Sequence, residues 1–159
     1  THRGTLFPYT TLFRSVKQAV AHFDLIHSVD SQHLLAAIDK EAEKIGKVQD
    51  ILLQVNVARE ESKTGAAVEE FPKLCCLAKE AQHVRVCGFM CMAPNFENVE
   101  ETRPVFRIAK ALYDDMKGKF PDGQVRYLSM GMTHDFEIAI EEGANIVRVG
   151  TAIFGPRNY

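Results

Sequence analysis

The chain has 159 residues, of which 46% are hydrophobic and 25% charged, a composition typical of a globular domain with a buried core. Its net charge of −2 without a basic stripe argues against nucleic acid as a partner, and no apolar run reaches the ~20 residues that a membrane span needs. We find no signal peptide and no zinc-ligand spacing among the four cysteines, so we expect reduced thiols in a cytoplasmic protein.

Apolar runs rich in branched residues alternate with segments of helical spacing from residue 16 onward. The expected strands cover residues 23–29, 51–57, 84–92, 125–130 and 146–149. The expected helices cover residues 31–45, 68–82, 101–117 and 133–142. Gly46 stands where a glycine would end the first of these helices. Repeated units of this kind predict a parallel α/β sheet, either open and doubly wound or part of a (β/α)8 barrel.

The opening segment, residues 1–15 (THRGTLFPYTTLFRS), departs from this pattern. It has no helical stripe and only a weak strand-like tail. It is either an irregular N-terminal arm or non-native sequence joined to a truncated gene, and we favour the second interpretation.

Ligands of parallel α/β folds bind beyond the carboxyl ends of the strands. One such end carries SMGMT, in which Gly131 lets the backbone approach a ligand and the hydroxyls of Ser129 and Thr133 are available to an anion. The alternative is a plain turn with Thr133 as the N-cap of the next helix. The next strand end carries Arg148, Gly150 and Thr151, either a second phosphate cradle or a structural ion pair at Arg148.

Two cradles on successive strands favour the barrel, because the last two loops of such barrels frequently bind a phosphate together. Gln54 and Asn56 lie on one face of an earlier strand and are expected to point into the barrel, or to make a structural hydrogen bond. The charged loop that follows, REESKTG, is expected to be solvated, with Lys63 as an amine near the ligand-binding end.

A family resemblance is carried by four stretches of the sequence. Residues 128–155, LSMGMTHDFEIAIEEGANIVRVGTAIFG, closely resemble the C-terminal signature of the pyridoxal phosphate (PLP) homeostasis proteins, the YggS/PROSC type. HFDLIHSVDS, QVNVAREESKTG and GFMCMAP resemble the segments of that family's fourth, fifth and sixth strands. The resemblance implies a partial TIM barrel of PLP fold-type III, similar to the N-terminal barrel of alanine racemase, with about five of the eight βα units present.

The resemblance also implies roles for individual residues. Ser129 and Gly131 correspond to one wall of the phosphate site. Gly150 and Thr151 correspond to the other wall. Arg148 corresponds to the partner of the pyridine nitrogen, while Asn56 and Met132 correspond to residues that line the ring. Lys63 matches a loop lysine to which we assign no role, and the resemblance implies neither a catalytic residue nor a metal.

Three βα units that precede the position of Val16 in the family have no counterpart in this sequence, and the first of them carries the Schiff-base lysine. We therefore expect residues 16–159 to be the C-terminal part of the barrel and residues 1–15 to lie outside the match. Such a chain is expected to bind PLP weakly, to be marginally stable and to aggregate, because open strand edges invite pairing.

The family's implied function is PLP binding and intracellular PLP homeostasis, as a carrier or regulator without established catalysis. PLP and PLP-dependent apo-enzymes are the implied partners, with no nucleic acid or membrane, and the full-length protein is expected to be a monomer. The alternative is a fold-type III PLP enzyme such as an amino-acid racemase, which needs a second catalytic residue, commonly from a partner subunit. A phosphate-binding barrel unrelated to PLP is a third, weaker interpretation.

Overall fold

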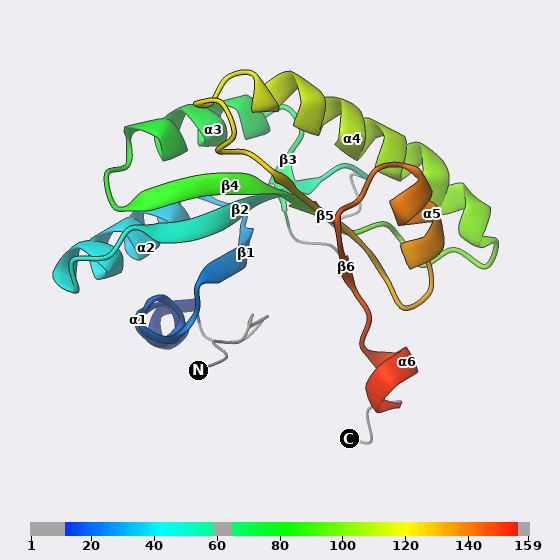
Figure 1. Cartoon of the computed structure of the whole chain (residues 1–159), viewed down its shortest axis with the longest axis horizontal. Helices are drawn as coiled ribbons and strands as arrows, with labels where there is room; N and C mark the ends of the chain where they lie inside the picture. Colours follow the sequence, from blue (N-terminus) through cyan, green and yellow to red (C-terminus); the bar gives the residue numbers. More distant parts are fainter. Residues whose placement is uncertain (1–11, 59–64, 156–159) are drawn as a thin grey trace.

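The computed structural model describes residues 12–58 and 65–155, and its strands form a single parallel sheet (Figure 1). The strands are β1 (Leu25–Val29), β2 (Gln49–Asn56), β3 (Ala66–Ala67), β4 (Val84–Cys91), β5 (Tyr127–Met132) and β6 (Ile146–Arg148). They are ordered β1-β2-β4-β5-β6, and the short β3 pairs with the end of β2. All the pairings are parallel, as the repeated strand–helix pattern predicted.

Helices α2 to α5 follow the strands in the expected order, whereas α1, before β1, and α6, after β6, were not expected. The helices are α1 (Leu12–His22), α2 (Gln32–Lys44), α3 (Phe71–Glu80), α4 (Arg103–Lys117), α5 (Phe136–Glu141) and α6 (Thr151–Phe154), with a 3-10 turn η1 (Val99–Thr102) before α4. Ser31 caps α2 through its hydroxyl, and Gly46 follows its end with a φ of 63°, as expected of a glycine C-cap.

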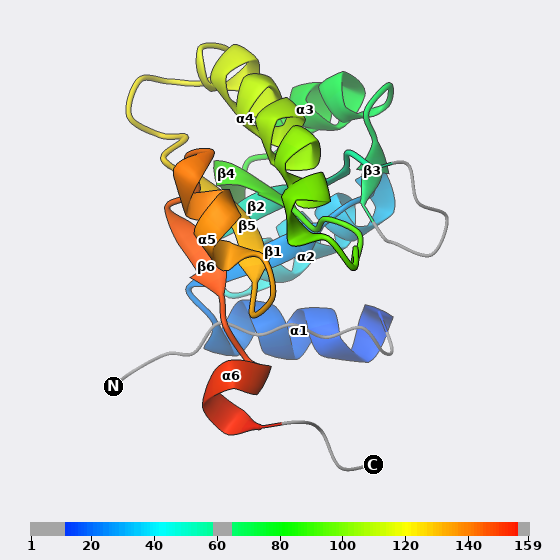
Figure 2. The same ribbon diagram turned by 90° about the vertical axis from the view of Figure 1, so that its right-hand side faces the viewer.

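The distribution of the core separates the two architectures that the sequence left open. Helices α1 to α5 all contribute buried side chains to one large apolar cluster, which they share with one face of the sheet, for example with Ile51, Leu53 and Val55 of β2. The intervening Leu52 belongs to a separate small cluster with Cys87 on the opposite face. Because a doubly wound sheet has helices on both faces, this one-sided arrangement is that of a half-barrel. Figure 2 shows the helices grouped around the curved strands.

The largest differences from the sequence-based expectation lie at α1 and between β5 and α5. Helix α1 begins inside the segment expected to lack structure, and it buries Val16, Ala19 and Val20 at helical spacing. In the unit of β5 and α5, the strand ends at Met132 instead of residue 130, and the helix begins at Phe136 instead of residue 133. The reason is a turn between them, closed by a hydrogen bond from the Asp135 amide to the Met132 carbonyl at 3.1 Å.

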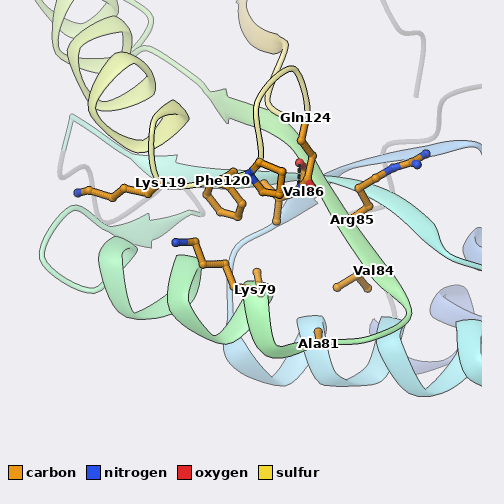
Figure 3. A pocket seen from close by; sticks show the side chains of 10 residues that line it. Lys79, Ala81, Val84, Arg85, Val86, Lys119, Phe120 and Gln124 are labelled. Atoms are coloured by element: carbon orange, nitrogen blue, oxygen red, sulfur yellow. Dashed lines mark hydrogen bonds between the residues drawn. The ribbon is translucent and has the colours of Figure 1, made fainter.

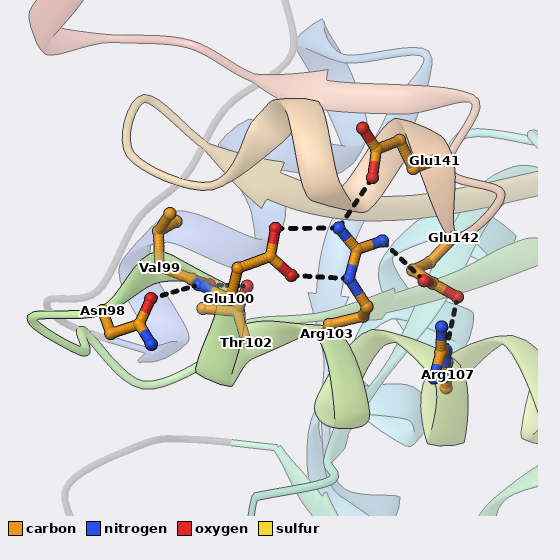
Figure 4. Close-up of polar contacts among 8 residues, drawn as sticks. All are labelled: Asn98, Val99, Glu100, Thr102, Arg103, Arg107, Glu141 and Glu142. Carbon is orange, nitrogen blue, oxygen red and sulfur yellow. Dashed lines mark hydrogen bonds and ion pairs between the residues drawn. The ribbon is translucent and has the colours of Figure 1, made fainter.

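Helix α5 is held against α4 by an ionic network around Arg103 (Figure 4). The Arg103 guanidinium contacts the carboxylates of Glu100 at 2.7 Å, Glu141 at 2.7 Å and Glu142 at 2.8 Å. Arg107 contacts Glu142 as well, at 3.1 Å. Because α5 lies between β5 and β6 in the chain, this network fixes the element that joins the two strands of the candidate site.

Candidate functional site

The carboxyl ends of β5 and β6 meet at one edge of the sheet, where Met132 is in register with Arg148. The Arg148 side chain crosses β5 on the inner face: Nη1 donates to Ser129 Oγ at 2.7 Å, and Nη2 donates to the Cys91 carbonyl at the end of β4 at 2.9 Å. Ser129 is fully buried. The guanidinium is therefore held in a defined position over three adjacent strands.

His27 of β1 joins this group from the far side. Its imidazole is buried, and Nδ1 lies 3.4 Å from Ser129 Oγ. Burial lowers the pKa of His27 to about 4, and the positive charge of Arg148 contributes in the same direction. Burial likewise lowers the pKa of Arg148 below its usual value. His27 was not among the site residues expected from the sequence, although its position two residues after Leu25 in β1 places it on the inner face.

A second contact joins the loops that follow the two strands. The Gly150 amide donates to the Thr133 hydroxyl at 3.1 Å. Thr133 does not cap α5, because Asp135 occupies the N-cap position. The alternative of a plain turn with Thr133 as N-cap is therefore wrong, and its hydroxyl instead connects the β5 and β6 loops.

The glycines of the two loops differ in what surrounds them. A Cβ added to Gly131, whose φ is +89°, would lie 2.6 Å from the Ala139 Cβ of α5. Close packing of strand and helix is therefore one reason for a glycine at this position, and the expected approach of its backbone to a ligand stays a prediction. A Cβ added to Gly150 would meet no atom of the described residues within 4 Å, so these residues leave the space in front of it empty. The adjoining Thr151 begins α6 and is exposed.

Asn56 lies at the same edge of the sheet but on β2, which β4 separates from β5. It is half-buried, and by strand alternation it shares the inner face with the buried Gln54. Met132 is 38% exposed at the end of β5. The structure thus brings Ser129, Met132, Arg148 and the two cradle loops together and leaves Asn56 across the inner face, while Lys63 falls outside the described residues.

A cavity of about 360 Å³ lies at the opposite ends of the strands (Figure 3). The start of β4, the end of α3 and the loop before β5 line it, with the Lys79 amine 5.1 Å from the centre of the Phe120 ring. The Gln124 side chain closes one wall by donating to the Val86 carbonyl at 3.0 Å. In barrels of this type the amino-terminal face supports stability rather than ligand chemistry, so we do not assign this cavity to the site.

No helix in residues 12–58 or 65–155 is long and apolar enough to cross a membrane. In the same ranges, no group of three or more His, Cys, Asp or Glu side chains is placed to hold a metal ion.

Comparison with known proteins identifies the class to which this fold and site belong. Residues 6–158 match the model of the alanine racemase N-terminal domain family, and the chain belongs to that family. The match begins before residue 16, where we had expected it to start.

Within this family, the curated relatives belong to the group of proteins that the sequence motifs indicated. The pyridoxal phosphate homeostasis protein of Aquifex aeolicus is 44% identical over 144 residues, which cover 91% of this chain and 63% of that protein. The protein of the same name from Escherichia coli is 32% identical over 139 residues, covering 87% and 58%. The chain thus spans a little under two thirds of these curated relatives. The resemblance to PLP homeostasis proteins is confirmed.

Solved structures agree with the half-barrel. PipY of Synechococcus elongatus, in a structure with PLP bound, is 31% identical with a TM-score of 0.76, covering 95% of this chain and 69% of PipY. Its structure without PLP has a TM-score of 0.82 at 32% identity, covering 96% of this chain and 68% of PipY. Alanine racemase of Clostridium difficile has a TM-score of 0.76 at 13% identity, covering 100% of this chain and 43% of that one, a likeness that concerns the fold.

Proposed function

We propose that this chain forms the phosphate and pyridine side of a PLP site and that its protein serves PLP homeostasis. One observation carries the proposal: Arg148 is fixed by Ser129 on the inner face, directly beside the contact between Thr133 and Gly150. These groups lie at the ends of the last two strands, where barrels of this type bind phosphates. The names of the relatives and the PLP-bound structure of PipY support the same ligand.

The residues present fit the chemistry of PLP. A phosphate requires hydrogen-bond donors and space, and we propose the hydroxyls of Thr133 and Thr151 as donors, beside the volume that the described residues leave empty at the Cβ position of Gly150. Gly131 and Gly150 are proposed to contribute backbone to the two walls. Ser129 is proposed to belong to this wall, as the resemblance implies, and its hydrogen bond with Arg148 supports a part in orienting the neighbouring guanidinium.

A pyridine nitrogen accepts a hydrogen bond, and Arg148 offers a donor that keeps its own proton. PLP, when bound, supplies an aldehyde and an electron-withdrawing ring. An arginine opposite the ring nitrogen weakens that electron withdrawal, which suits a carrier better than a catalyst. Asn56 and Met132 are proposed to line the ring, as they lie at the same edge of the sheet.

The protein is proposed to hold and deliver PLP to apo-enzymes, rather than to turn over a substrate, as a cytoplasmic monomer. This part of the proposal draws on the names of the relatives, which are homeostasis proteins. The amino-acid racemase alternative draws on a likeness at 13% identity, which concerns the fold, so no specific observation favours it.

The test is to titrate the purified chain with PLP, to follow the phosphorus NMR signal, and to measure the intact mass after borohydride reduction. We expect weak, saturable binding that Arg148→Met reduces, and an unmodified mass because the Schiff-base lysine is expected outside these residues. The absence of saturable binding at millimolar PLP would refute the proposed site. A single specific adduct, for instance on Lys63, would instead refute the expectation about the lysine.

A further inference from the structure

Asp135 is the one carboxylate that is buried among the residues that the structure describes, with 6% of its surface exposed. Burying a charge is costly unless the charge is paired and hydrogen-bonded. A surface Ser or Asn would serve equally well to begin a short helix such as α5. The position of this carboxylate therefore calls for a reason beyond capping.

The side chain and the amide of Asp135 bond back toward β5, while its carbonyl accepts the Ala139 amide of α5 at 3.0 Å. Its Oδ1 accepts from the Met132 amide at 2.6 Å, and its own amide donates to the Met132 carbonyl at 3.1 Å. Its side chain makes no capping hydrogen bond to α5. This reciprocal pair closes the turn between Met132 and Asp135 from both sides, which fixes the backbone of the residues in between.

The closed turn is connected to the loop after β6. Met132 is in register with Arg148, and Thr133, the next residue in the turn, accepts a hydrogen bond from the Gly150 amide. The carboxylate also lies within electrostatic reach of the guanidinium, because its negative charge opposes the lowering of the Arg148 pKa by burial. The buried Asp135 side chain is thus connected to the turn after β5 by a hydrogen bond and to Arg148 at the end of β6 by its charge.

We propose that Asp135 is a positioning residue of the phosphate site: by holding the Met132 amide, it sets the Thr133 hydroxyl against the Gly150 amide, so that two loops form one wall. This inference rests on the proposed function and adds a residue that touches no ligand itself. It acts through the acceptor oxygen, and an amide oxygen at the same place serves the same purpose.

The experiment compares Asp135→Ala, Asp135→Asn and, as a matched control, Glu137→Ala, which removes an exposed carboxylate two residues further along. Each chain is titrated with PLP and with pyridoxal, which has the same ring without the phosphate. A lost charge-assisted hydrogen bond corresponds to roughly a tenfold change. We therefore expect Asp135→Ala to weaken PLP binding about tenfold and to leave pyridoxal binding unchanged. Asp135→Asn retains most of the affinity for PLP, and the control retains all of it.

A measurement without ligand separates this inference from the proposed function. In the amide NMR spectrum, Asp135→Ala is expected to shift the signals of Thr133 and Gly150, while Asp135→Asn, which folds with the acceptor in place, leaves Gly150 near its original position. An unchanged Gly150 signal in Asp135→Ala, or an equal loss of PLP and pyridoxal binding, would overturn the positioning role. Failure of the unsubstituted chain to bind PLP, together with the expected amide shifts, would refute the proposed function and leave the positioning intact.

Discussion

At the scale of single residues, Gly88 shows how closely β4 and β5 approach. A Cβ at this position would lie 1.9 Å from the backbone oxygen of Tyr127, a contact that no change of rotamer relieves. We expect Gly88→Ala to lower the free energy of unfolding by about 3 kcal/mol or more, measured by urea denaturation. Gly118→Ala is the matched control: Gly118 has a φ of −68° at the end of α4, and no atom of the described residues lies within 4 Å of its Cβ position. It is expected to be neutral or to stabilise by about 0.5 kcal/mol, and equal losses in both variants would contradict the steric explanation.

His27 makes the stability of the folded chain depend on pH. Its pKa is lowered from 6.5 to about 4, so the folded chain keeps the imidazole neutral where the unfolded chain protonates it. The stability due to this difference is fully present above about pH 6.5 and is lost as the pH falls toward 4, a change of at most about 3 kcal/mol. Urea denaturation between pH 7 and pH 4.5 is expected to show a flatter dependence for His27→Gln, with the exposed His134→Gln as control. The same slope in His27→Gln and the unsubstituted chain would exclude His27 as its origin.

At the scale of elements, the Arg103 network couples α4 to α5. The hydrogen bonds from Arg103 are the main cause of the lowered pKa of Glu100 and of Glu142. The stability that these two ion pairs contribute is therefore present above the ordinary carboxyl pKa and is lost as the pH falls through the lowered pKa values. We expect Arg103→Met to lower the melting temperature and to speed amide hydrogen exchange in α5. Arg107→Met, which loses the contact to Glu142 alone, is expected to have a smaller effect. Exchange in α5 that is equally fast in both variants would argue against Arg103 as the centre of the network.

The sequence predicted most elements because their patterns are local. The helix expected over residues 31–45 is α2, Gln32–Lys44, since its hydrophobic stripe and the glycine that follows its end are close together in the sequence. Helix α1 was missed because the unusual composition of residues 1–15 outweighed the buried spacing of Val16, Ala19 and Val20. The two residues of β3 were missed since they carry no periodicity and form a strand by pairing with β2.

At the scale of the whole molecule, the half-barrel has two strand edges. Among the described strands, β1 pairs with β2 alone and β6 with β5 alone. Unpaired strand edges promote association, so we expect this chain to be marginally stable and to aggregate on heating. Circular dichroism melts over a range of concentrations, combined with light scattering, measure this. A cooperative, concentration-independent melt of a monomer would show that the strand edges do not cause aggregation.

The sequence by itself determined the alternation of strands and helices, the parallel sheet and the motifs at the ends of its last two strands. Each of these features depends on residues that are close together in the chain. Tertiary structure alone decided that the helices cover one face and that His27, Ser129 and Arg148 meet on the other. His27 and Ser129 are 102 residues apart, and their contact depends on the order and register of strands that no local pattern specifies. The same holds for Thr133 and Gly150, whose hydrogen bond exists because β5 and β6 are neighbours in the sheet.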